Sequence, residues 1–281
     1  MAEEAIRKRR RISVPGPCPA RIIFSGMVLS LLLLPALPLH AAESPRPKTT
    51  AADCRAHQIE ARIQDVSALG DINLDTGIHV HLADILLPES GPLRDQALRL
   101  IRDMTGEAVS VSHARKKDRW GRYRAAVRLN GQDITGQLVK QGLAVIDTGE
   151  AASLCNHHLS ALEQQAREQA SGLWALDSYK PVPASDTQRL LERKGRFTIV
   201  TGRVRSVGER EKRTYLNFGK DWKNDFTVTI SSKVWSDMVK SGVSASRLTG
   251  REVSVRGVIR QWNGPALDIL SADMIMLTGG V

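Results

Sequence analysis

Apolar and polar residues alternate along several short segments of the first half of the chain. This period of two is typical of strands with one buried face. Asp75-Thr76-Gly77 separates two of the segments and favours a hairpin turn. The pattern predicts strands at residues 59–63, 71–74, 78–86, 108–113 and 123–129.

A helical period takes over between these strands. Between Gly91 and Gly106 the apolar side chains recur on one helix face while arginines fall outside it, and Gly106 ends the segment. Shorter and longer helices are predicted at residues 134–142 and 154–174. Asn130-Gly131 favours a tight turn before the first of these. The first half is therefore predicted to be a strand-rich barrel with three helices.

The second half shows another set of strands after a proline-containing stretch. Residues 177–194 are predicted to be a linker with a short helix. Strands follow at 197–207, 214–218 and 225–231, then a helix at 233–241, then strands at 252–261 and 266–269. Three strands, a helix and two strands is the element order of an OB fold. A second, smaller OB-like β-barrel is therefore predicted over residues 195–281.

The N-terminus has the composition of an export signal. A basic start precedes an apolar run at residues 22–39 and the small-residue exit His40-Ala41-Ala42. We interpret residues 1–42 as a signal peptide and residues 43–56 as a flexible arm, which implies a periplasmic or secreted protein. The alternative is a retained membrane anchor, because the run approaches the spanning length. No later segment of the sequence is apolar enough to span a bilayer.

The net charge indicates what kind of molecule the protein binds, and the cysteines bear on the redox state of its compartment. Forty Lys and Arg face 30 Asp and Glu, a net charge of +10, which favours a polyanionic partner. Removal of the leader would leave two cysteines, Cys54 and Cys155. In an oxidising compartment they are predicted to pair as a disulfide; two separate buried thiols are the alternative.

A series of short motifs carries a family resemblance. In order they are Gly70-Asp71, Pro88-Glu89, Trp120-Gly121-Arg122, Gly142-Leu143-Ala144 and Gly172-Leu173-Trp174. Over residues 57–176 this series resembles the staphylococcal nuclease (thermonuclease) family. The resemblance implies a mainly β fold with α-helices, namely a five-stranded OB-type β-barrel with three helices packed on it.

The resemblance also implies a site for cutting phosphodiesters. In that family two aspartates and a backbone carbonyl hold Ca²⁺, a glutamate acts on the attacking water, and two arginines grip the phosphate. Asp71 matches the first aspartate, the Leu87 backbone carbonyl the third ligand, Glu89 the glutamate and Arg122 the second arginine. Glu89 could instead be a residue of the first helical turn, favoured by the helix dipole, and Arg122 a surface cation.

Two family positions are replaced. His81 stands where the first arginine is expected, and it lacks the bidentate fork of arginine. Leu86 stands where the second aspartate is expected and cannot ligate a metal, so a bound Ca²⁺ or other divalent cation would be weak or absent. Asp84 could substitute for it if the strand were shifted, or be an ordinary solvent-facing carboxylate. Asp118 has a family-like loop position or is a turn residue.

Nucleic-acid binding has a signal of its own in two clusters. Basic side chains surround a tryptophan in the first half, and aromatic side chains fall in or beside the second set of strands. The alternatives are a solvated charged face and a barrel core. The predicted binding residues are Arg115, Lys116, Lys117, Arg119, Trp120, Tyr215, Phe218 and Trp262.

Together these features predict an exported, thermonuclease-like protein that binds single-stranded DNA or RNA. Asp71, Glu89 and Arg122, assisted by His81, would hydrolyse phosphodiester bonds with a divalent cation. The alternative is a non-catalytic nucleic-acid-binding or envelope interaction protein with a degenerate nuclease site, which the replacements at 81 and 86 favour. A scaffold for acidic envelope polymers is a third reading and rests on charge alone.

Overall fold

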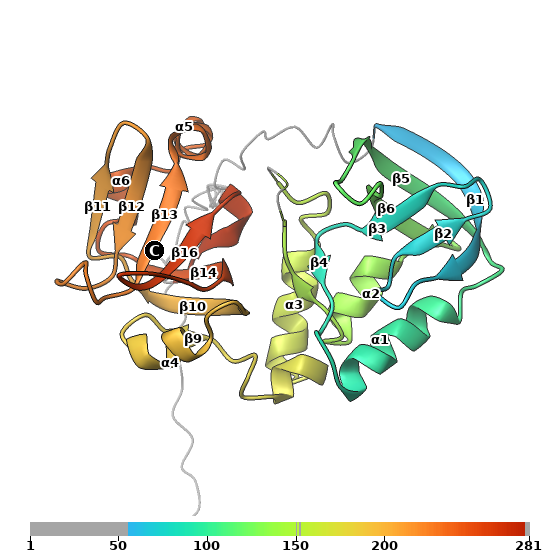
Figure 1. The fold of residues 1–281 in the computed structure, drawn as a ribbon, viewed down its shortest axis with the longest axis horizontal. Coiled ribbons are helices and arrows are strands. Elements are labelled where there is room, and N and C mark those ends of the chain that lie inside the picture. The colour runs from blue at the N-terminus through green and yellow to red at the C-terminus, as the bar shows by residue number, and fades with distance from the viewer. Residues whose placement is uncertain (1–55, 150, 152, 279–281) are drawn as a thin grey trace, which may run out of the picture. The chain divides into compact units, whose positions relative to one another are not determined.

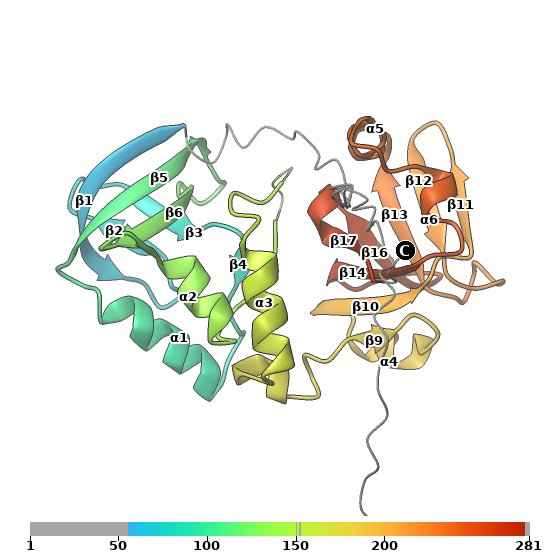
Figure 2. The ribbon, with the colours of Figure 1, turned by 180° about the vertical axis from the view of Figure 1, so that it is seen from behind.

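A closed five-stranded barrel forms the first half of the chain in the computed structural model, which describes residues 56–149, 151 and 153–278. The pairings β1–β2, β2–β3, β1–β5 and β5–β6 are antiparallel, and a parallel β3–β6 pairing closes the ring. Figure 1 shows these strands together, and Figure 2 shows them from behind. The barrel strands are β1 (His57–Val66), β2 (Ile72–Leu74), β3 (His79–Leu82), β5 (Ala108–Lys117) and β6 (Tyr123–Leu129).

Three helices lie on this barrel, as predicted. The helix α1 (Pro92–Arg102) starts with proline, which suits a first helical turn, and buries Ala97, Leu98 and Ile101. The helix α2 (Ile134–Lys140) is capped by the Asp133 carboxylate, which accepts the Thr135 amide at 3.1 Å. The mostly β, OB-type fold is thereby confirmed. The remaining elements of this half are β4 (Ile85–Leu86), β7 (Gln132–Asp133), β8 (Val145–Ile146), α3 (Leu159–Glu168) and the 3₁₀ turn η1 (Gly172–Ala175).

Two predicted elements were wrong in extent. The strand expected at residues 78–86 breaks at Asp84, whose φ is 69°, so that β4 leaves the barrel and pairs with β8. The helix expected at residues 154–174 is shorter in the structure, where α3 covers only the middle of that range. It ends at Glu168, and Ala170 just beyond its C-cap is left-handed with φ 49°. Gly172 lies beyond the helix with φ 53°, where a side chain would meet the Gly142 carbonyl oxygen at 2.4 Å. The chain therefore leaves the helix at a left-handed residue, and the close backbone approach at Gly172 comes after it.

The C-terminal strands form two sheets with a separate apolar core. One sheet has the order β17-β14-β10-β9 and the other β11-β12-β13-β16-β15. The predicted second OB-like barrel is not confirmed by these pairings. Within residues 177–194, β9 pairs with β10 and Val182 is fully buried. The strands are β9 (Val182–Pro183), β10 (Phe197–Arg203), β11 (Ser206–Glu209), β12 (Arg213–Asn217), β13 (Thr227–Ser231), β14 (Glu252–Val258), β15 (Arg260–Trp262), β16 (Gly264–Ile269) and β17 (Ile275–Leu277).

Short helices complete this half of the chain, and α4 lies where a short helix was predicted. No helix among residues 56–149, 151 and 153–278 has the length and apolar character needed to cross a bilayer. The helical elements are α4 (Thr187–Glu192), α5 (Ser232–Lys240), α6 (Ala245–Leu248) and the 3₁₀ turn η2 (Ala272–Met274).

A buried ion pair connects β14 to α3. Arg256 is 3% exposed and Glu163 2% exposed. Two Arg256 nitrogens donate to the two Glu163 oxygens at 3.0 and 2.8 Å. Glu163 also accepts the Ile146 amide at 3.0 Å and Arg167 at 2.9 Å, while Arg256 donates to the Ile146 carbonyl at 3.2 Å. Each charge is thereby satisfied away from water, as a buried ion requires.

Candidate functional site

Asp71 is the centre of a polar cluster on the barrel. It precedes β2, and both of its carboxylate oxygens accept from one Arg122 nitrogen, at 2.8 and 2.9 Å. The His81 Nδ1 lies 2.9 Å from one of the same oxygens. Burial alone would raise the pKa of Asp71, but the hydrogen bonds from His81 and Arg122 outweigh it and hold that pKa below its ordinary value. Asp71 is therefore a carboxylate shared by the Arg122 guanidinium and the His81 ring.

Arg122 is fixed by a tight turn at the end of the β5–β6 hairpin. The Asp118 carboxylate accepts the amides of Trp120 and Arg122 and the Arg122 Nε, each at 2.9 Å. Burial would lower the pKa of Arg122, and the carboxylates of Asp118 and Asp71 raise it above its ordinary value. Asp118 is thus engaged as a turn residue. Arg122 remains a cation held on both sides by carboxylates.

The same hairpin exposes the other predicted basic residues. The turn is shorter than the expected loop at 114–122, because β5 continues to Lys117 and pairs it with Tyr123. Trp120 is 63% exposed, and the guanidiniums of Arg119 and Arg122 lie 3.9 and 4.8 Å from its ring centroid. The structure gathers on this hairpin the exposed side chains of Arg115, Lys116, Lys117, Arg119 and Trp120.

Glu89 lies apart from the Asp71 cluster. It follows Pro88, is exposed, and lines a pocket of about 310 Å³. His81 lines a different pocket of about 190 Å³, and the two pockets share Leu86 and Leu87 in their walls. The structure therefore brings Asp71, His81 and Arg122 together, while Glu89 opens on the other side of this wall.

These residues do not fit a Ca²⁺ ion. Ca²⁺ takes six to eight oxygen ligands, whereas both Asp71 oxygens already accept from Arg122, one of them also contacts His81, and Leu86 is apolar. Asp84 is no substitute, since it is buried and accepts the amides of Cys155 and Asn156 at 2.7 and 2.8 Å. In the part of the chain that the structure describes, no three His, Cys, Asp or Glu side chains group together to hold a metal.

The Asp84 carboxylate is instead a structural link. It also accepts from Arg124, the neighbour of His81 in the β3–β6 register. Burial raises the pKa of Asp84, against the opposing effects of Arg124 and the two amides. The left-handed conformation at Asp84 places its carboxylate on these amides. The predicted partner of Cys155, Cys54, lies outside the described residues, so the disulfide stays a prediction.

The predicted aromatic residues of the C-terminal sheets divide into two groups. Tyr215 and Trp262 stack with centroids 5.7 Å apart, and with Trp222 they line a groove of about 400 Å³. Phe218 lies 5.1 Å from Phe226 and packs on the core instead. The structure thus places Tyr215, Trp222 and Trp262 side by side at an exposed surface, among the strands where base-stacking aromatic side chains were expected.

Sequence reasoning missed three residues that line the Glu89 pocket. Tyr179, Arg193 and Arg196 come from the stretch at and beside the predicted linker. Their only signal in the sequence is the basic group Arg193-Lys194-Gly195-Arg196 with a glycine inside it. From sequence alone, a basic group with a glycine inside it indicates a solvent-exposed turn and not a pocket wall.

A closed five-stranded barrel with helices packed on it and a basic hairpin defines an OB-type class of domain. Residues 79–176 match the family described as staphylococcal nuclease homologue. The expected resemblance to that family is thereby confirmed, and it indicates a nuclease-like, nucleic-acid-binding function. No curated protein matches the chain.

Proposed function

We propose that this protein is exported and binds single-stranded DNA or RNA through the β5–β6 hairpin. The observation that carries the proposal is the exposed cluster of Arg115, Lys116, Lys117 and Arg119 around Trp120 on a structurally fixed turn. Cations of this kind contact phosphates without reading sequence, and binding then weakens as salt rises. The basic composition of the chain and the leader-like N-terminus support the same assignment.

The cations of the hairpin differ in whether carboxylates of the same domain already bind them. Arg122 is held by Asp118 and Asp71 and supports the turn. Lys116 and Lys117 are exposed, and no salt bridge holds either of them among the described residues. The lysines are therefore among the side chains available to phosphates, with Lys117 also lying 5.2 Å from the Tyr123 ring centroid. Trp120 adds a large ring at the tip, on which guanidiniums rest and beside which a base can pack.

A second candidate function is phosphodiester hydrolysis by Glu89. Its carboxylate has no hydrogen-bond or ion-pair partner in the described part of the chain and opens into a pocket. A free carboxylate beside a bound strand can accept the proton of an attacking water. No step is assigned to a divalent cation, because the donor set around Asp71 does not fit one.

The binding proposal is tested by anisotropy of fluorescent single-stranded DNA and RNA over a range of salt concentrations. Replacing Lys116 and Lys117 together by Ala should lower the salt slope by about 1.4, at roughly 0.7 for each phosphate contact of a single strand. The matched control replaces two exposed lysines of α5, Lys233 and Lys240. Absence of binding, or equal effects of the two double variants, would overturn the proposal.

Hydrolysis is tested on the same strands with Ca²⁺, Mg²⁺ or EDTA. Cleavage that persists in EDTA and disappears in Glu89→Gln supports the second candidate. Binding without cleavage leaves the protein as a non-catalytic binder. Cleavage that survives Glu89→Gln would show that another group accepts the proton.

A further inference from the structure

Two arginines are presented on one tight turn after α4. The Arg196 amide donates to the Arg193 carbonyl at 2.9 Å, and Gly195 between them has φ 81°, which favours glycine. The Gly195 amide donates to the Ile259 carbonyl at 2.8 Å, and the Ile259 amide returns to the Arg196 carbonyl at 3.1 Å. The turn is therefore anchored to the C-terminal sheets, and its side chains start from fixed backbone.

The two guanidiniums differ in how they are held. Arg193 donates to the carbonyls of Ser178 and, at 3.2 Å, Asp177. Arg196 is exposed and, within the described residues, its guanidinium has no hydrogen-bond or ion-pair partner. Burial and then the neighbouring cations Arg189 and Arg196 lower the pKa of Arg193. Like charges are thus held close together here, a condition that an anion relieves.

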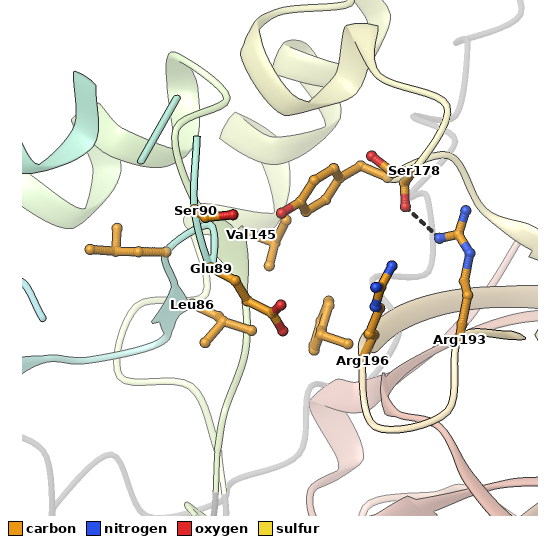
Figure 3. Close-up of a pocket in the computed structure, with 10 residues that line it drawn as sticks. Leu86, Glu89, Ser90, Val145, Ser178, Arg193 and Arg196 are labelled. Carbon is orange, nitrogen blue, oxygen red and sulfur yellow. Dashed lines mark hydrogen bonds between the residues drawn. The ribbon is translucent and has the colours of Figure 1, made fainter. Parts of the chain in front are cut away.

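Both arginines share a pocket with Glu89. Figure 3 shows the Glu89 side chain on one side of the pocket and Arg196 on the other, with the Arg193 guanidinium turned to Ser178 along the dashed hydrogen bond. The pocket has a volume of about 310 Å³. Burial, followed by the charge of Glu89, raises the pKa of Tyr179, so the carboxylate acts electrostatically on this pocket wall. No salt bridge joins Glu89 to either arginine within the described residues.

We infer that this pocket binds a phosphodiester of single-stranded nucleic acid, with Arg193 and Arg196 on its oxygens and Glu89 beside it. The inference rests on the proposed binding function. Two guanidinium charges against one carboxylate leave one positive charge, which matches the single charge of a diester better than the nearly double charge of a terminal phosphate. The turn would then supply the arginine that position 81 lacks, from a segment beyond the matched residues 79–176.

The test compares Arg196→Ala with Arg189→Ala. Arg189 is a cation of the same neighbourhood that does not line the pocket, so it controls for loss of charge alone. Affinity for an oligothymidylate is measured over a range of salt concentrations. Arg196→Ala should lower affinity roughly tenfold at low salt and reduce the salt slope by about 0.7, and Arg196→Lys should restore part of both. Arg189→Ala should leave the slope unchanged.

A second arm separates the two sources of phosphate. The same strands are compared with and without a 5′-phosphate, and the ratio of wild-type to Arg196→Ala affinity should be equal for both. A loss confined to the 5′-phosphorylated strand would overturn the diester assignment. Equal slopes for the Arg196 and Arg189 variants, with strand binding intact, would overturn the pocket and leave the hairpin proposal standing. A wild-type protein that binds no strand overturns the proposed function, and this inference with it.

Discussion

Removing Arg256 should be among the most destabilising single changes in this protein. Arg256→Met would leave the Glu163 carboxylate, 2% exposed, with the Ile146 amide and Arg167 as donors and without its two contacts to Arg256. Breaking a buried ion pair on one side costs about 3–5 kcal/mol of unfolding free energy. For a chain of this size that corresponds to a fall in Tm of about 6–20 °C.

Urea unfolding followed by circular dichroism measures the loss. The control is Arg203→Met, because Arg203 pairs with Glu252 at an exposed site where such a pair contributes about 0–1 kcal/mol. The double variant Glu163→Met/Arg256→Met should regain part of the stability, since apolar replacement of both charges is often neutral while the Ile146 amide and Arg167 lose Glu163 as acceptor. A loss below about 1 kcal/mol in Arg256→Met, or a double variant as unstable as the sum of the single changes, would refute the reasoning.

Three further perturbations follow from contacts elsewhere. Gly142→Ala places a Cβ 2.1 Å from the Ser171 carbonyl oxygen and should cost about 3 kcal/mol or more of unfolding free energy. The control Gly149→Ala, which meets open space, should cost about 1 kcal/mol. Equal losses in chemical denaturation would contradict the packing argument. Asp84→Ala leaves the amides of Cys155 and Asn156 without their acceptor and should cost about 3 kcal/mol of unfolding free energy. Asp75→Ala should cost about 1 kcal/mol, because Asp75 accepts one exposed amide, and chemical denaturation measures both losses. The net lowering of the Asp71 pKa, despite burial, stabilises the fold above the unfolded pKa of about 3.9 and is lost as pH falls through the folded pKa. Unfolding between pH 2 and 7 should therefore show less acid sensitivity in Asp71→Asn, and an unchanged profile would refute this.

Local pattern was sufficient for the barrel strands and the amphipathic helices. Alternation placed β1, β2 and β6, and Gly91 placed the start of α1, which ends at Arg102, before the expected Gly106. The break at Asp84 was not predictable, because an aspartate takes up a left-handed conformation there to reach amides about 70 residues further along the chain. Local propensity carries no information about such distant donors.

The candidate site shows the same division. Spacing between motifs grouped Asp71, His81 and Arg122, and the structure places their side chains in contact. The motif spacing could not indicate that both Asp71 oxygens accept from Arg122, since that depends on the hairpin turn at Asp118. Nor could it connect Arg196 with Glu89, more than 100 positions earlier. That juxtaposition depends on tertiary contacts, among them the hydrogen bonds that fasten the turn after α4 to Ile259.

The occupation of Asp71 determines how hard a metal centre would be to build in this barrel. Leu86→Asp would place a second carboxylate at the family position, yet an incoming cation would still compete with Arg122 and His81 for both Asp71 oxygens. Freeing Arg122 in turn removes a contact that supports the hairpin. Gain of a metal centre here therefore requires several coordinated changes, and a mutational path through single substitutions would cross variants that have lost the present ion pairs before any new ligand set is complete.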